Sequence, residues 1–153
     1  MAALKDRLRQ DLTASMKARD ALRSSTLRMA LSAVTNAEVA GKEARQLDDD
    51  EVTLVLVSEA KKRREAAAAF ADAGRDELAA KERAEAEVLA DYLPAQLTAD
   101  EVSALVTSAI EQTGTADQGM KGMGRVMGVL KSQVSGRADG AVVAAEVRRQ
   151  LGA

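Results

Sequence analysis

The sequence contains no cysteine, no histidine and no tryptophan, and among its 153 residues proline, phenylalanine and tyrosine occur once each. Without cysteine and histidine, the chain has no means of forming disulfides, Cys/His zinc sites or thiol nucleophiles, and imidazole acid–base catalysis is excluded. The aromatic residues that favour strands are nearly absent, whereas alanine, the strongest helix former, supplies 32 residues. The composition therefore predicts an all-α fold.

The sequence also lacks a long hydrophobic run. Residues 1–10 alternate charges with leucine, unlike a secretory signal, and the longest strongly apolar run, residues 52–57, is far shorter than the roughly 20 residues that cross a bilayer. We therefore expect a soluble, cytoplasmic protein with no membrane partner. The formal net charge of −2 neither predicts nor excludes a nucleic-acid partner, because a basic face can exist within a nearly neutral total.

Apolar residues recur at helical spacing through the N-terminal part of the chain. The pattern predicts an amphipathic first helix and a second helix that Asp20 caps and Gly41 ends in a left-handed conformation. An acidic segment opens a third helix, which Gly74 ends, and Asp76 is expected to cap a fourth. The short turn between the last two predicts a long antiparallel helical hairpin over residues 51–92.

Pro94 is the candidate boundary between two domains, because proline disfavours helical geometry in the residue before it. The sequence predicts an N-terminal helical domain over residues 1–93 and a small three-helix domain over residues 94–153. A capping box of Thr98 and Glu101 opens the first helix of this second domain. The residues expected to face the core from its other two helices are Met120, Met123, Met127, Leu130, Val134, Val143, Val147 and Leu151.

Two clusters of charge in the hairpin have both a chemical and a structural interpretation. Glu82 and Glu85 are a candidate pair for acid–base catalysis or for binding a divalent metal. Folding of the hairpin brings Lys62 and Arg63 roughly opposite them, so we favour structural ion pairs. The basic run 61–64 suggests RNA, but neighbouring glutamates balance it and favour a solvated helix face. No catalytic constellation, metal site or cofactor site is predicted.

The glycine-rich segment 119–128 resembles a phosphate-binding loop only superficially. Its glycine spacing does not match a dinucleotide motif, and no strand precedes it. Gly124 and Gly128 lie four residues apart on a predicted helix, a spacing that we interpret as close packing of a neighbouring helix.

The segment 117–149 is locally basic, with six cations against three acids. Guanidinium groups and exposed backbone donors suit phosphates, although the aromatic residues that stack on single-stranded bases are missing. The residues alone leave an RNA surface and a solvated surface equally supported. The candidate RNA-contacting residues are Lys121, Arg125, Lys131, Arg137, Arg148 and Arg149.

Several segments resemble, in order and spacing, the bacterial YqeY family, also called GatB/YqeY. They are LRMALSAVTNAE (27–38), SEAKKRREAAAAF (58–70), AGRDELAAKERAE (73–85), YLPAQLTADEV (92–102) and GMGRVMGVLKSQVSGRADG (122–140). The resemblance covers nearly the whole chain. It implies a C-terminal module shared with the tail of the B subunit of the glutamine-dependent aminoacyl-tRNA amidotransferase.

In that enzyme the tail is a helical appendage that helps to hold tRNA, while the catalytic chemistry lies elsewhere. The resemblance therefore implies a tRNA-related binding role, which is linked by family to carbon–nitrogen ligase activity with glutamine as amido donor. This chain lacks the amidase region and the length of the catalytic cradle, and Asp139 replaces the asparagine of the tail's usual turn.

Three hypotheses follow about function. The first is a non-catalytic helical module that binds tRNA or another structured RNA. The second is a protein-interaction adaptor that acts through the hairpin without RNA. The third is an amidotransferase component, which would require partner subunits because the chain alone has no evident nucleophile.

Overall fold

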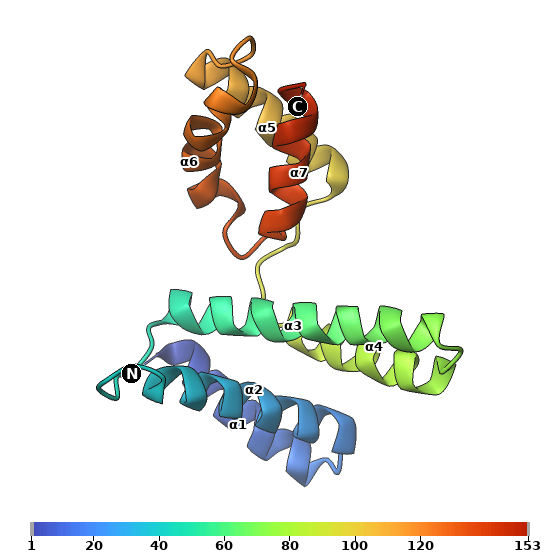
Figure 1. Cartoon of the computed structure of the whole chain (residues 1–153). Helices are drawn as coiled ribbons and strands as arrows, with labels where there is room; N and C mark the ends of the chain where they lie inside the picture. The colour runs from blue at the N-terminus through green and yellow to red at the C-terminus, as the bar shows by residue number, and fades with distance from the viewer. Residues whose placement is uncertain (1, 153) are drawn as a thin grey trace. The chain divides into compact units, whose positions relative to one another are not determined.

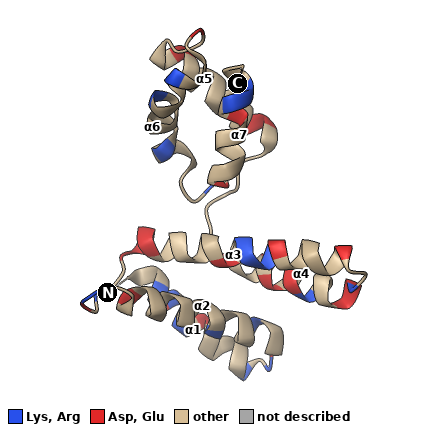
Figure 2. Ribbon diagram, viewed as in Figure 1, with Lys and Arg blue, Asp and Glu red and all other residues tan. Residues whose placement is uncertain are grey.

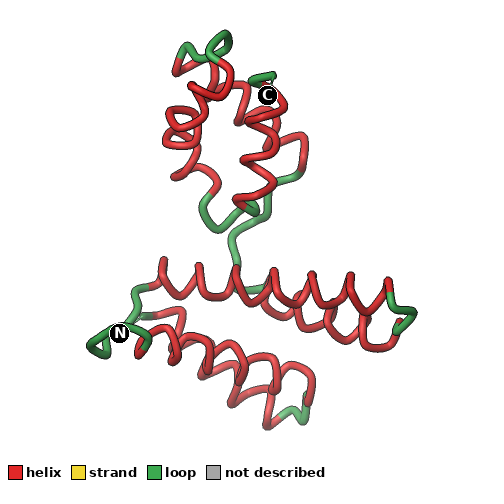
Figure 3. Tube along the Cα trace, in the orientation of Figure 1, coloured by secondary structure: helices red, strands yellow, loops and turns green. Residues whose placement is uncertain are grey.

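The structure is a computed structural model that describes residues 2–152, which form seven α-helices, one 3-10 helix and no strand (Figure 3). The all-α prediction is therefore confirmed. Contacts divide the chain into two units, Met1–Leu93 and Pro94–Ala153, called here the N-terminal and C-terminal units (Figure 1). Among the described residues, no helix combines the length and the apolar character needed to cross a membrane.

The N-terminal unit consists of two antiparallel helical hairpins. Its helices are α1 (Ala3–Lys17), α2 (Ala21–Val39), α3 (Asp49–Asp72) and α4 (Asp76–Ala90). The core is formed by apolar side chains from all four helices, including Leu8, Leu27, Val52, Leu56 and Leu89. The α3–α4 pair is the predicted long hairpin. Only alanines and Glu85 are buried in its distal half, so the two helices pack closely there.

Local chemistry explains most helix ends of this unit. The Asp20 carboxylate accepts a hydrogen bond from Arg23 N at 3.0 Å, and Gly74 ends α3 with a φ of 74°. Two expectations were wrong. Gly41 does not adopt the left-handed conformation, although it follows the C-cap of α2, and Asp76 is the first helical residue of α4 rather than its cap.

The end of α4 is fixed by the only tyrosine of the chain. Tyr92 Oη donates to Asp11 Oδ2 at 2.6 Å and accepts from Arg23 Nη2 at 3.1 Å, while the Arg7 guanidinium lies 4.7 Å from the ring centroid. Burial, together with the bond to Asp11, raises the pKa of Tyr92 to about 12. The phenol therefore stays protonated at ordinary pH, and its fluorescence is a probe of the N-terminal unit alone.

Arg19, between α1 and α2, is a non-glycine residue with a positive φ of 58°. It occupies the position after a helix where glycine is favoured, and Asp20 N donates across it to Ser15 O at 2.9 Å. We expect Arg19→Gly to raise the free energy of unfolding by about 0.5–1 kcal/mol, because glycine relieves the left-handed strain. Urea denaturation followed by Tyr92 fluorescence measures this change.

Two controls separate strain from charge at this turn. Arg19→Ala removes the charge but keeps the strain, so its stability should match that of the wild type. Ala18→Gly places glycine at a φ of −76°, where no strain exists, and should lower stability. A gain in Arg19→Ala equal to that in Arg19→Gly would attribute the effect to charge.

The C-terminal unit is a three-helix arrangement. It contains α5 (Ala99–Thr113), the 3-10 helix η1 (Gly119–Gly122), α6 (Met123–Val134) and α7 (Gly140–Gln150). The predicted capping box opens α5, with Thr98 and Glu101 bonded reciprocally, and the Asp139 carboxylate caps α7. Its core includes Val106, Val126, Leu130, Val143 and Val147, all fully buried.

The segment before α6 differs from the predicted continuous helix. Residues 119–122 form a 3-10 turn, and Met120 is exposed instead of facing the core. At this turn Gly122 closely approaches the fully buried Thr115, which follows the C-cap of α5. A side chain at residue 122 has no room, so the chain turns there before α6 begins.

Candidate nucleic-acid interface

Helix α6 is strongly two-sided. Val126, Leu130 and Val134 face the core of the C-terminal unit, and the opposite face is open to solvent. Five exposed residues of this opposite face and of the adjoining turn η1 are defined here as the α6 face: Lys121, Gly124, Arg125, Gly128 and Lys131; the small side chain of Ser132 is exposed beside them. Figure 2 shows its cationic positions along η1 and α6.

The three cations of the α6 face have no acidic partner. Lys121, Arg125 and Lys131 are exposed to solvent. Within residues 2–152, none of them forms an ion pair or a side-chain hydrogen bond. Their charge is therefore not neutralised within the described part of the molecule. An anionic partner would find these three cations on α6 and the turn that precedes it.

The two glycines of the α6 face lie between its cations. A Cβ atom at Gly124 or Gly128 would have nothing within 4 Å, and neither residue has a positive φ. The expected close packing of another helix on these glycines is therefore wrong. Gly128, in the interior of α6, costs about 1 kcal/mol of helix stability relative to alanine, and no contact among the described residues requires either glycine.

Two of the remaining candidates are engaged within the C-terminal unit. Arg149 forms a bidentate pair with Glu146, at 2.9 Å from Nε and 2.6 Å from Nη2. The hydrogen bonds from Arg149 and Gln150 lower the pKa of Glu146 to about 2, so this pair stays charged and mutually neutralised. Arg137 Nε donates to Ala95 O at 3.3 Å, which ties the start of the unit to the turn between α6 and α7.

Arg148 is exposed on α7 and has no ion pair among the described residues. Arg148 therefore lies on a different helix from Arg125 and Lys131. Of the six candidates, the structure thus brings together Lys121, Arg125 and Lys131. Sequence spacing alone already places Arg149 one helical turn from Glu146, a signal that the sequence interpretation did not use.

The hairpin acids are arranged around one guanidinium. Arg63 Nη1 lies 3.5 Å from Glu82 and 4.0 Å from Glu85, and its Nη2 lies 3.4 Å from Glu59. The predicted cross-hairpin ion pairs are confirmed for Arg63, whereas Lys62 pairs with Glu59 on its own helix. Burial, and next the charge of Glu82, raise the pKa of Glu85. Among residues 2–152 no set of three acids is placed to hold a metal ion.

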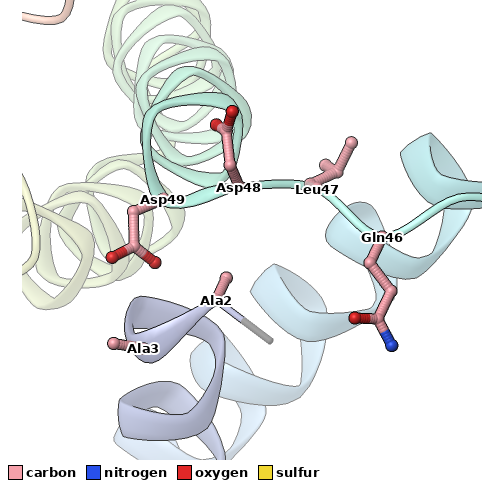
Figure 4. Close-up of a pocket in the computed structure, with 6 residues that line it drawn as sticks. All are labelled: Ala2, Ala3, Gln46, Leu47, Asp48 and Asp49. Carbon is pink, nitrogen blue, oxygen red and sulfur yellow. The ribbon is translucent and has the colours of Figure 1, made fainter.

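A surface pocket lies where α1 begins, lined by Ala2, Ala3 and the segment 46–49 (Figure 4). Its carboxylates already have partners. Asp49 Oδ1 accepts from Leu4 N at 3.0 Å, which caps α1 in place of an N-cap side chain, and Asp48 Oδ1 accepts from Glu51 N at 2.9 Å. The carboxylates of this pocket therefore serve to cap the N-termini of α1 and α3.

The fold and the α6 face define a small helical protein whose C-terminal unit presents a basic helix face. A family model described as Yqey-like protein matches residues 5–151. The chain therefore belongs to the YqeY-like protein family, as the segments of the sequence indicate. No curated protein sequence matches it.

Proposed function

We propose that the chain is a non-catalytic RNA-associated module, and that its C-terminal unit binds the RNA backbone through the α6 face. The observation that carries the proposal is the group of Lys121 on η1 and Arg125 and Lys131 on α6, three exposed cations without an acidic partner among the described residues. Cations in this state attract phosphates without first breaking an internal ion pair.

Transfer RNA is the first ligand to test, because the resemblance of the C-terminal module to the amidotransferase tail implies a tRNA-related role. The proposal places the contact on α6 rather than on the turn at Arg137, whose guanidinium already bonds to Ala95. A carbon–nitrogen ligase role with glutamine as amido donor would require partner subunits to supply the chemistry.

The double variant Lys121→Glu/Arg125→Glu should weaken tRNA binding at least tenfold, or by about 1.4 kcal/mol. Reversal of both charges replaces attraction to phosphates by repulsion and affects all tRNAs alike. Fluorescence anisotropy of labelled tRNA at several salt concentrations measures the effect. For the wild type, three phosphate contacts predict a log–log salt slope of about 3, which the variant should reduce by about 2.

The matched control is Arg64→Glu/Arg83→Glu, which changes the net charge equally at two exposed positions of the hairpin. It should bind tRNA nearly as the wild type does. Equal losses in both double variants would show that only total charge matters and would contradict the α6 assignment. Absence of tRNA binding by the wild type at low salt would contradict the proposed function itself.

The second candidate function is a protein-interaction adaptor that uses the hairpin. It is supported by exposed apolar residues near the turn of the hairpin, which include Ala68, Ala69, Leu78 and Ala80. Analytical ultracentrifugation and affinity capture test this possibility. A strictly monomeric protein that retains no partner would count against it.

A further inference from the structure

This inference rests on the proposed function and concerns the class of RNA that the α6 face binds. The centre of the face, at Gly124 and Gly128, carries no side chains. We infer that the α6 face docks on a double-helical RNA stem, with the smooth strip of α6 at Gly124 and Gly128 against the minor groove. The three cations flank this strip and meet the phosphates on its borders.

The first step concerns rigidity. Arg125 and Lys131 are six residues apart on α6, which is about 9 Å along the helix axis, and Lys121 lies in the adjoining turn η1. The backbone fixes the positions from which these cations extend, and a regular array of phosphates can meet all three at once. A stem presents its phosphates in this way, whereas a single strand must first be ordered at an entropic cost.

The second step concerns shape. Gly124 and Gly128 are one turn apart, about 6 Å, and space around both is open, so the helix backbone is accessible between the cations. The minor groove of A-form RNA is wide and shallow and presents 2′-hydroxyls beside its phosphates. A helix without protruding side chains approaches such a surface closely. The minor groove of B-form DNA is only about 6 Å wide and does not admit a helix about 10 Å across.

The third step concerns the absence of stacking groups. Phe70 and Tyr92 are the only aromatic residues of the sequence, and both precede the C-terminal unit. Proteins that bind single strands rely on aromatic side chains to stack the bases. The C-terminal unit therefore has electrostatic and shape contacts to offer, and these suit a stem.

The experiment compares three labelled probes of equal length: an RNA duplex of 16 base pairs, one of its strands alone, and the DNA duplex of the same sequence. The RNA duplex should bind at least fivefold more tightly than either of the others at the same salt concentration. The variant Gly124→Gln/Gly128→Gln adds two neutral side chains to the strip and should weaken RNA-duplex binding at least fivefold.

The design keeps folding and binding apart. Glutamine is a better helix former than glycine and has open space at both positions, so the melting temperature of the variant should equal or exceed that of the wild type. The control Ala104→Gln/Ser108→Gln places the same side chains at the same spacing on the exposed side of α5 and should bind RNA as the wild type does.

Each outcome decides a different point. If the wild type binds no RNA, the proposed function fails as a whole. If it binds RNA but the single strand or the DNA duplex binds equally well, or the glycine variant keeps full affinity, the stem assignment is overturned while the proposed function stands. A change in the oligomeric state of the RNA-free protein on glycine substitution, measured as its mass in solution, would assign the α6 face to a second copy of the chain and overturn the inference.

Discussion

Arg63→Met should lower the free energy of unfolding of the N-terminal unit by about 3 kcal/mol at pH 7. Arg63 is the shared cation of three carboxylates, and the side chains of Glu82 and Glu85 are only 17% and 7% exposed. Removal of the guanidinium leaves those charges close together in a poorly solvated place. Methionine preserves the apolar part of the side chain, so the loss reports the missing charge rather than a cavity.

The loss in free energy of unfolding caused by Arg63→Met should become smaller as the pH falls. The pKa of Glu85 already lies above its ordinary value of 4.5, because burial and then the charge of Glu82 oppose ionisation. Without Arg63, the folded protein binds protons at these carboxyls still more tightly than the unfolded chain does. Stability of the variant relative to the wild type therefore rises as pH decreases toward 4.5. Hydrogen bonds from Lys5 and Arg45 are the main cause of the lowered pKa values of Glu38 and Glu51. The stability that these two carboxylates contribute is lost as the pH falls, but the loss is equal in the variant and the wild type and leaves their difference unchanged.

Urea denaturation followed by Tyr92 fluorescence at several pH values measures both effects. The neighbouring variant Arg64→Met is the control, because Arg64 is exposed and has no ion pair among the described residues, and its stability should change by less than about 0.5 kcal/mol. The triple variant Arg63→Met/Glu82→Gln/Glu85→Gln should recover most of the loss. Equal losses in Arg63→Met and Arg64→Met, or a loss that persists at low pH, would show that Arg63 does not act through the buried carboxyls.

Features determined by neighbouring residues in the sequence could be predicted. The caps at Asp20, Thr98 and Asp139 and the helix end at Gly74 depend on a single side chain and the adjacent backbone. The Arg63 ion pairs followed from folding the hairpin about that glycine. Gly41 shows the limit of this reasoning, because a glycine permits the left-handed conformation but does not require it.

Features determined by which helix covers which face could not be predicted in the same way. The sequence places two glycines on α6, but only the packing of α5 and α7 shows that they are exposed. The candidate cations illustrate the same limit. Arg137 bonds to Ala95, a residue forty-two positions away in the sequence, whereas Lys121 has no such bond.

Gly122→Ala should lower the free energy of unfolding of the C-terminal unit by about 2–3 kcal/mol. The added Cβ would lie 2.6 Å from Thr115 Cβ, much closer than carbon atoms approach, and the backbone at Gly122 has ordinary helical angles. Strain at φ is therefore not the cause of the loss. Thr115 is fully buried at the end of α5, so relief requires that α5 and η1 move apart and open the core.

Matched substitutions test this explanation, because they are expected to change stability in opposite directions. Gly128→Ala adds the same methyl group on the open side of α6 and should raise stability by about 1 kcal/mol, which urea denaturation followed by far-UV circular dichroism measures. Thr115→Ala should not rescue Gly122→Ala, because alanine retains the Cβ that makes the shortest contact. Thr115→Gly removes that atom and should rescue in part. If Gly122→Ala and Gly128→Ala stabilise the unit equally, the close approach does not determine where α6 begins, and intrinsic helix propensity alone governs both positions.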